Sequence, residues 1–204
     1  MLADHLGQFH ISSDARSVET SRTRSRIYRG GLSKYQMTQR DLRLWMLEDQ
    51  NSDARFTTMF DLYGLPRGFP AFEESRGRPD PYERVAFLEE AFGADIGDRR
   101  FVPYLQLHEF EALVLSDPSK LDIEFLRHDG PIRRLTDMSA QFACPELIDD
   151  QDPPSRRIIQ EIPEYEGRKS SAGPRIAIKI GLPAIRQKCP HFDAWLRQLE
   201  RLAN

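Results

Sequence analysis

Two short runs of aromatic and β-branched residues each end on polar side chains, and both have the pattern of strands. The first run covers residues 55–61 and stops on Asp61, just before a segment that contains glycine and proline. The second covers residues 101–107 and leads into His108, Glu109, Phe110 and Glu111. In an open α/β sheet, ligands bind in the crevice outside the carboxyl ends of the strands. We therefore expect a functional site where these two strands end.

Helical patterns precede and separate these strands. A short helix is expected over residues 2–9, and a longer one should run from a capping box formed by Ser33 and Gln36 to about residue 51. The sequence Asp80-Pro81-Tyr82-Glu83 is typical of a helix start, with Asp as N-cap and Pro in the first helical position. That helix should end at Gly93 to Gly97. A further strand is expected over residues 16–20, a basic loop after it, and a long loop over residues 64–79.

From about residue 118 onward the periodicity is helical. Candidate helices cover residues 118–127, 131–142, 154–161, 174–180 and 191–202. Before that point strands alternate with helices, which favours a parallel sheet. We therefore expect an α/β fold: a small, mainly parallel sheet flanked by helices over residues 1–117, and a helical region over residues 118–204 packed on it.

Composition limits the classes of protein that are compatible with this pattern. The chain has 204 residues and a net charge of −3, which suits one domain or one domain with a helical appendage. No stretch reaches the ~18 apolar residues of a membrane span, and no signal peptide is evident, so we expect a cytoplasmic protein without a membrane partner. The two cysteines, Cys144 and Cys189, are expected to be buried thiols in a reducing compartment. Cys189 and His191 are two potential zinc ligands with no partner pair nearby in the sequence, which falls short of the four ligands of a structural zinc site.

Charge is unevenly distributed near the beginning of the chain. Between residues 16 and 40 there are seven Lys or Arg residues and a single acid, Glu19. Residues 21–26 alternate arginine with hydroxyl side chains, and such a loop can direct guanidinium groups and backbone amides at phosphates. A solvated basic loop is the alternative. The candidate nucleic-acid-binding residues are Arg22, Arg24, Arg26, Arg29 and Lys34.

Three separated blocks resemble a bacterial family known as domain of unknown function 4276. They are residues 56–66, 104–113 and 189–196, and the likeness covers almost the whole chain. That family is grouped with Toprim-like proteins, which have small parallel α/β sheets and occur in topoisomerases, primases and certain nucleases. Their site uses a glutamate after the first strand and an Asp-x-Asp motif after a later one to bind Mg²⁺ or Mn²⁺ for phosphodiester chemistry. Family members often lie beside genes for ATPases of the ABC or SMC type, in a context that suggests phage defence.

The sequence departs from this family pattern in two ways. Family members usually begin with a strand that ends in a Val-Glu-Gly-like motif and supplies the first glutamate, and no such motif is present here. Residues 1–6 resemble the helix that follows that strand, so we expect the N-terminal strand to be missing. The Asp-x-Asp motif is reduced to Asp61-Leu62-Tyr63, which leaves one aspartate.

The resemblance implies roles for the acidic residues at the two strand ends. Asp61, Glu109 and Glu111 are the expected ligands of Mg²⁺ or Mn²⁺, and Asp61, Glu109 and His108 are the catalytic candidates. Residues two apart on a helix point in different directions, so we expect only Glu109 to face Asp61, with Glu111 a surface acid or salt-bridge partner. His108 is a general base, a phosphate ligand or a residue that caps a helix start, and Asp61 is otherwise a turn-forming aspartate.

Two hypotheses about function follow, and a third is weaker. The first is a Toprim-like, metal-dependent nuclease subunit of a bacterial defence module that works with an ABC- or SMC-type ATPase. Whether this subunit is active or inactive stays open, because the upstream glutamate is absent. The second is a non-catalytic, partner-binding or regulatory subunit of the same kind of module. The third is a phosphoesterase that acts on a small phosphorylated substrate.

Overall fold

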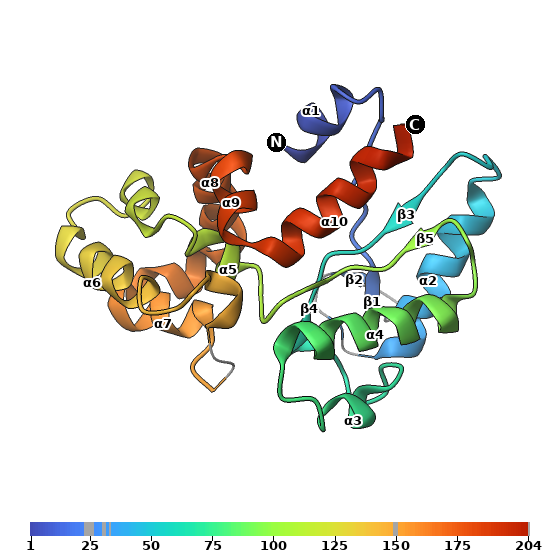
Figure 1. The fold of residues 1–204 in the computed structure, drawn as a ribbon, viewed down its shortest axis with the longest axis horizontal. Coiled ribbons are helices and arrows are strands. Elements are labelled where there is room, and N and C mark those ends of the chain that lie inside the picture. The colour runs from blue at the N-terminus through green and yellow to red at the C-terminus, as the bar shows by residue number, and fades with distance from the viewer. Residues whose placement is uncertain (23–26, 30–31, 33, 149–150, 204) are drawn as a thin grey trace. The chain divides into compact units, whose positions relative to one another are not determined.

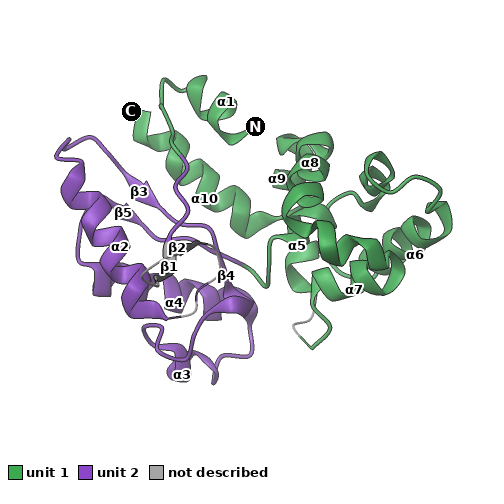
Figure 2. Cartoon of the chain, turned by 180° about the vertical axis from the view of Figure 1, so that it is seen from behind, with its two compact units in different colours: residues 1–14, 107–204 green, residues 15–106 purple. Residues whose placement is uncertain are grey.

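The chain forms two compact units in the computed structural model, which describes residues 1–22, 27–29, 32, 34–148 and 151–203, without the side chains of residues 19–22 and 27–29. One unit is residues 15–106, and the other combines residues 1–14 with residues 107–204 (Figure 2). The division therefore falls at residues 106 and 107, whereas the sequence suggested residue 117. The reason is that Val114 and Leu115 belong to the same buried cluster as the C-terminal helices.

Unit 15–106 has α/β architecture, as expected, and it contains two pairs of parallel strands. Strand β3 (Phe56–Thr57) pairs in parallel with β5 (Phe101–Val102), and β4 (Phe60–Asp61) pairs in parallel with β6 (Leu105–Gln106). The crossover between them contains helix α4 (Pro81–Ile96), as in a βαβ unit (Figure 1). Strand β1 (Glu19–Arg22) is antiparallel to β2 (Ile27–Arg29), so the strand expected near residue 16 belongs to a hairpin.

Both of the strands expected from sequence are interrupted in the middle. Pro103 has no N–H to donate to a ladder, and it lies between β5 and β6. The buried hydroxyl of Thr58 donates to the carbonyl oxygen of Tyr104 (2.9 Å) and accepts from the Tyr104 N–H (3.4 Å). The Thr58 side chain therefore provides the backbone of Tyr104 with the partners that a continuous ladder would have supplied.

Helix α4 begins as its sequence predicts. The Asp80 carboxylate accepts hydrogen bonds from the N–H groups of Tyr82 (2.8 Å) and Glu83 (3.0 Å). The helix ends at Gly97, whose φ of +71° is readily adopted by glycine. Gly93, expected to help end the helix, lies inside it. The loop expected over residues 64–79 contains the short helix α3 (Phe72–Ser75).

Helix α2 (Tyr35–Glu48) is held to the strands at its C-terminal end. Ser33 of the expected capping box lies outside the described residues, and the helix begins at Tyr35 with Lys34 as its N-cap residue. At the other end the Arg100 guanidinium donates to the carbonyl oxygens of Met46 (2.8 Å) and Asp49 (2.7 Å). It also lies over the Phe56 ring, 5.1 Å from the centroid. The core between α2, α4 and the strands is aromatic and contains Tyr35, Phe56, Phe69, Phe92 and Phe101.

The other unit is helical, which agrees with the expected C-terminal helical region. Helix α7 (Pro154–Glu161) has the bounds that the sequence predicts, whereas residues 118–127 contain only a short 3-10 segment, η2 (Pro118–Ile123). Helix α8 begins before Pro174, which lies in its second turn. None of the helices in the described ranges is long and apolar enough to cross a membrane. The remaining elements are α1 (Leu2–Gly7), α5 (Glu111–Val114), α6 (Asp129–Ser139), η3 (Pro145–Leu147), η4 (Pro163–Arg168), α8 (Lys169–Ile180), α9 (Leu182–Lys188), α10 (Pro190–Glu200) and η5 (Arg201–Ala203).

We predict that Thr58→Val lowers the free energy of unfolding by about 1–3 kcal/mol, the net contribution of the two buried hydrogen bonds that are removed. Valine has nearly the shape of threonine but cannot bond to Tyr104. Urea denaturation followed by circular dichroism measures the change. Thr58→Ser is the matched control, because it keeps the hydroxyl and should retain more of the stability than valine does. Equal losses in the two variants would contradict this account of the strand break.

Candidate functional site

Asp61 lies where the sequence predicts, at the carboxyl end of a parallel strand. It is the last residue of β4 and faces Gln106, the last residue of β6, across the ladder. Gln106 is fully buried, and its Oε1 accepts a hydrogen bond of 2.7 Å from the Tyr104 hydroxyl. Asp61 is half-buried and precedes η1 (Leu62–Gly64), a segment lying wholly within the described residues, to which its side chain makes no capping hydrogen bond. The carboxylate is therefore not explained as a cap of the turn that follows.

Glu109 and Glu111 belong to the helical unit, and both are buried, with 8% and 6% of their surface exposed. Glu109 accepts a hydrogen bond from the backbone N–H of Ser155, in the first turn of α7. Glu111 accepts one from the Tyr165 hydroxyl (3.1 Å). The expectation that Glu111 is a surface acid is wrong. The argument from helix directions does not apply, because α5 begins at Glu111 and Glu109 lies before it.

Burial and the negative charge of Glu109 oppose the ionisation of Glu111. Burial raises the pKa of Glu111 above its ordinary value of 4.5, and the negative charge of Glu109 raises it further. Lys169 acts in the opposite direction. Burial, followed by the charge of Glu111, also raises the pKa of Tyr165, so the shared proton of this hydrogen bond stays on the hydroxyl. The result is a buried pair of carboxylates whose mutual repulsion is only partly offset.

The oxygen donors of this pair are of the type that Mg²⁺ and Mn²⁺ prefer. Glu109 and Glu111 each already accept a hydrogen bond from the protein. Throughout the described part of the chain, no group of three or more His, Cys, Asp or Glu side chains is arranged to hold a metal ion. The donor set therefore suits at most one weakly held ion that keeps several of its waters, and the metal role of Asp61, Glu109 and Glu111 stays a prediction.

His108 lies between β6 and α5 in an unusual backbone conformation. It is buried, and its φ of +58° falls in the left-handed region, which costs a non-glycine residue about 1–3 kcal/mol. It does not cap a helix, since the N-cap residue of α5 is Phe110. Its roles as general base or phosphate ligand stay predictions.

The predicted nucleic-acid contacts fall mostly where the structure gives no side chains. Arg24 and Arg26 lie outside the described residues, and the side chains of Arg22 and Arg29 are not described either. Lys34 is exposed and precedes α2. The binding role of these five residues therefore stays a prediction.

Glu146 was missed by the sequence reasoning. It is fully buried, and its two carboxylate oxygens accept hydrogen bonds from the N–H groups of His191 (2.9 Å) and Phe192 (3.0 Å), in the first turn of α10. Negative charge is stabilised at a helix N-terminus, so Glu146 serves as a long-range cap. The helical pattern over residues 191–202 was visible in the sequence, but it did not indicate which distant acid caps the helix.

A pocket of about 440 Å³ opens in the same unit and was also not anticipated. Beside it, Arg186 forms ion pairs with Asp193 and Glu200, and His5 Nε2 lies 2.6 Å from Glu200 Oε1. Burial opposes ionisation of Glu200, but the bonds from Arg186 and His5 outweigh it and lower the pKa of Glu200. These pairs connect α1, α9 and α10. The lining residues are His5, Leu182, Pro183, Arg186, Gln187, Asp193 and Arg197.

We predict that the free energy of unfolding of the natural protein falls as pH rises, and that Glu111→Gln makes this fall smaller. A carboxyl whose pKa is raised by folding binds its proton more tightly in the folded state. Stability therefore falls as pH climbs from the ordinary pKa of 4.5 to the raised one, by about 1.4 kcal/mol for each pH unit of that interval. Glutamine carries no charge and can still accept the bond from Tyr165. Urea denaturation from pH 4 to 8 should show a smaller decline for the variant, and parallel curves would contradict the raised pKa.

Comparisons with known proteins place the chain in a family. No curated protein and no solved structure matches it. A family model described as "Domain of unknown function (DUF4276)" matches residues 1–200 of the 204 residues. This range includes β4, the buried acid pair and α10, and so covers every residue considered above as a candidate for function. The chain belongs to the DUF4276 family.

Proposed function

We propose that this protein is a Toprim-like, Mg²⁺- or Mn²⁺-dependent nuclease subunit of a bacterial defence module, working with an ABC- or SMC-type ATPase. In this proposal Asp61 and Glu109 bind the metal ion, and the basic segment from Arg22 to Lys34 holds the nucleic-acid backbone. His108 is the candidate general base. The sequence lacks the first glutamate that family members usually carry after an N-terminal strand, so in this proposal the metal site has one ligand fewer than the family pattern.

One observation supports the proposal most directly: Asp61 ends a strand that pairs in parallel with β6. The carboxyl ends of parallel strands are where α/β folds bind ligands, and a carboxylate there can reach a metal ion or a substrate. A second segment of the family pattern, including Glu109 and Glu111, follows β6 within five residues in the chain. The resemblance to Toprim-like proteins supplies the reaction, phosphodiester cleavage, and the partner class.

A specific observation favours a second function, that of a non-catalytic partner-binding or regulatory subunit. Glu109 accepts a hydrogen bond from the first turn of α7, and Glu111 accepts one from Tyr165. Both carboxylates thus have structural roles that do not need a metal ion. In this alternative Asp61 is also structural, and the protein acts by binding its partner.

Replacing Asp61 by asparagine distinguishes the two functions. A metal ligand contributes several kcal/mol to the transition state, so Asp61→Asn should lower Mg²⁺- or Mn²⁺-dependent cleavage on the order of a hundredfold or more. The measurement is cleavage of labelled single- and double-stranded DNA and RNA by the purified protein, with the folded state checked by circular dichroism.

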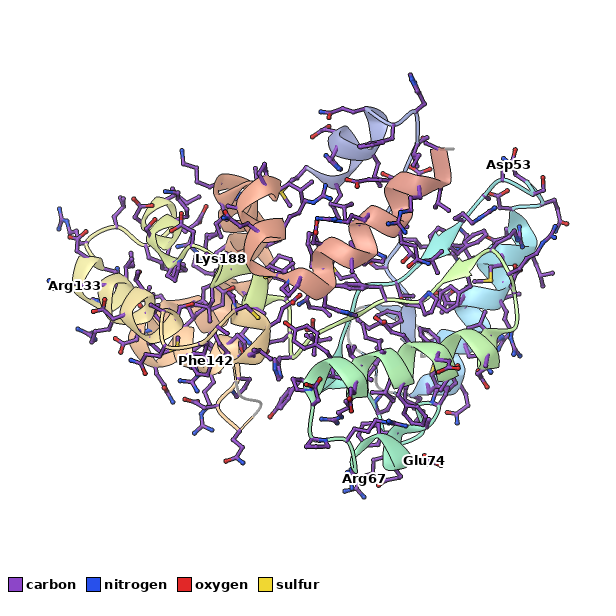
Figure 3. All side chains as sticks on the ribbon, in the orientation of Figure 1. Asp53, Arg67, Glu74, Arg133, Phe142 and Lys188 are labelled. Atoms are coloured by element: carbon purple, nitrogen blue, oxygen red, sulfur yellow. The ribbon has the colours of Figure 1, made fainter. Side chains whose placement is uncertain are left out.

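The matched control is Asp53→Asn. Asp53 is an exposed aspartate in the loop before β3, labelled at the edge of the ribbon in Figure 3, and its replacement should leave cleavage unchanged. An Asp61→Asn protein as active as the natural one contradicts the nuclease proposal. If cleavage is absent from both proteins while partner co-purification persists, the binding subunit is favoured.

Binding of nucleic acid through the basic segment should depend steeply on salt. Each phosphate contact that is lost lowers the slope of log affinity against log salt by about 0.9 for double-stranded DNA. We predict that replacing Arg22 and Arg24 by alanine lowers both the affinity and the slope, as measured by fluorescence anisotropy at several salt concentrations. Arg133→Ala is the control, since Arg133 is an exposed arginine on α6 that points away from the ribbon (Figure 3). Equal effects of the two changes would exclude the basic segment as the binding surface.

A further inference from the structure

Each of the two cysteines directly precedes a helical segment, and hydrogen bonds to Glu146 join these two segments. Cys144 is the N-cap residue of η3, and Cys189 is the N-cap residue of α10. Each is followed by a proline in the first helical position. Both are free thiols, Cys189 fully buried and Cys144 half-buried. The sequence holds no other cysteine, so only one intramolecular pairing is available.

Glu146 holds these two cysteine-bearing starts together. It lies two residues after Cys144, and its oxygens accept hydrogen bonds from His191 (2.9 Å) and Phe192 (3.0 Å), two and three residues after Cys189. Because both bonds start within three residues of a cysteine, the two cysteine backbones are confined to the same small region of the helical unit.

The thiols also interact electrostatically. Burial raises the pKa of Cys189, the charge of Glu146 raises it further, and Cys144 contributes in the same direction, while a bond from Ser116 opposes them. Ser116 Oγ lies 3.4 Å from Cys189 Sγ. Cys189 is therefore a shielded, protonated thiol, whereas the half-buried Cys144 is the one that solvent can reach.

We propose that Cys144 is a site of oxidation by peroxides and that its oxidised form is resolved by Cys189 into an intramolecular disulfide. The role is separate from the proposed nuclease function and does not depend on it. A disulfide requires Cα atoms about 4.4–6.8 Å apart. The side chains of residues 141–144 are exposed or half-buried, and Phe142 among them packs against the buried cluster of this unit. A movement of this segment toward α10 therefore costs mainly the contacts of Phe142.

The chemistry is balanced in two steps. The Cys144 sulfur attacks one oxygen of the peroxide, the O–O bond breaks, and Cys144 becomes a sulfenic acid while the second peroxide oxygen takes the thiol proton and leaves as an alcohol or water. The Cys189 sulfur then attacks the Cys144 sulfur, the S–O bond breaks, and the hydroxyl leaves as water with the proton of the Cys189 thiol. In total, two thiols lose two electrons and two protons, and the peroxide accepts them.

The bond would have an effect beyond the two cysteines. The η3 segment packs against α5, whose first residue is Glu111, so a covalent link between η3 and α10 would fix the support of the buried acid pair. The disulfide would also close a loop of the chain in the unfolded state, which stabilises the folded form. Oxidation should therefore raise the melting temperature.

The test is mass spectrometry of the intact full-length protein after treatment with hydrogen peroxide. We expect a loss of the mass of two hydrogen atoms, two thiols protected from alkylation after unfolding, a Cys144–Cys189 cross-linked peptide, and full reversal by dithiothreitol. The melting temperature of the oxidised protein should be higher than that of the reduced one.

Two variants keep the test decisive. Cys144→Ser changes a half-buried residue, and its Cys189 should stay reduced under the same treatment, because it is buried. Cys189→Ala leaves Cys144 without a resolving thiol, and its sulfenic acid should be trapped by a 1,3-dione reagent. Addition of oxygen atoms to Cys144 with Cys189 still alkylatable would overturn the proposal, as would disulfide-linked dimers in place of the internal bond.

Discussion

The helical unit depends on carboxylates that reach helix N-termini from far away in the sequence. The first N–H groups of a helix have no partner within it, and a buried helix end must find one elsewhere. Glu109 supplies that partner for α7, and Glu146 supplies it for α10. The carboxylates are themselves buried, so each helix stabilises the charge that stabilises the helix. Removing either side of such a pair would leave the other without a counterpart in the interior.

The α/β unit solves a comparable problem with different groups. Its strands are short because Pro103 interrupts them, and the hydroxyl of Thr58 restores the missing bonds across the gap. Arg100 provides donors for the last carbonyl groups of α2 while its flat face covers Phe56. In both units, single side chains complete the backbone hydrogen bonding where regular structure stops, and one of them, Glu109, is also a candidate site residue.

Much of the fold could be predicted from the sequence, because local signals determined it. The parallel pairing, the start of α4 at Asp80 and the helix over residues 154–161 all followed from strand–helix alternation and N-cap chemistry. The predictions that were wrong depended on tertiary contacts. The buried Glu111 accepts its hydrogen bond from Tyr165, which is distant in sequence, and the cap supplied by Glu146 is equally non-local. The position of Asp61 at a strand end was predicted correctly. Which side chains surround a strand end depends on tertiary packing, and no local sequence pattern encodes it.

The membership of residues 1–14 in the unit formed by residues 107–204 has a consequence for the order in which the chain becomes structured. His5 bonds to Glu200 across a separation of 195 residues. On the ribosome, residues 15–106 emerge as a contiguous segment that contains every strand pair described, and they can fold while synthesis continues. The α1 segment has to wait until α9 and α10 have been made before it finds Arg186 and Glu200. The contacts between α1 and the C-terminal helices therefore form last, because they join residues that are very far apart in the sequence. Until then α1 stays exposed to proteases and chaperones.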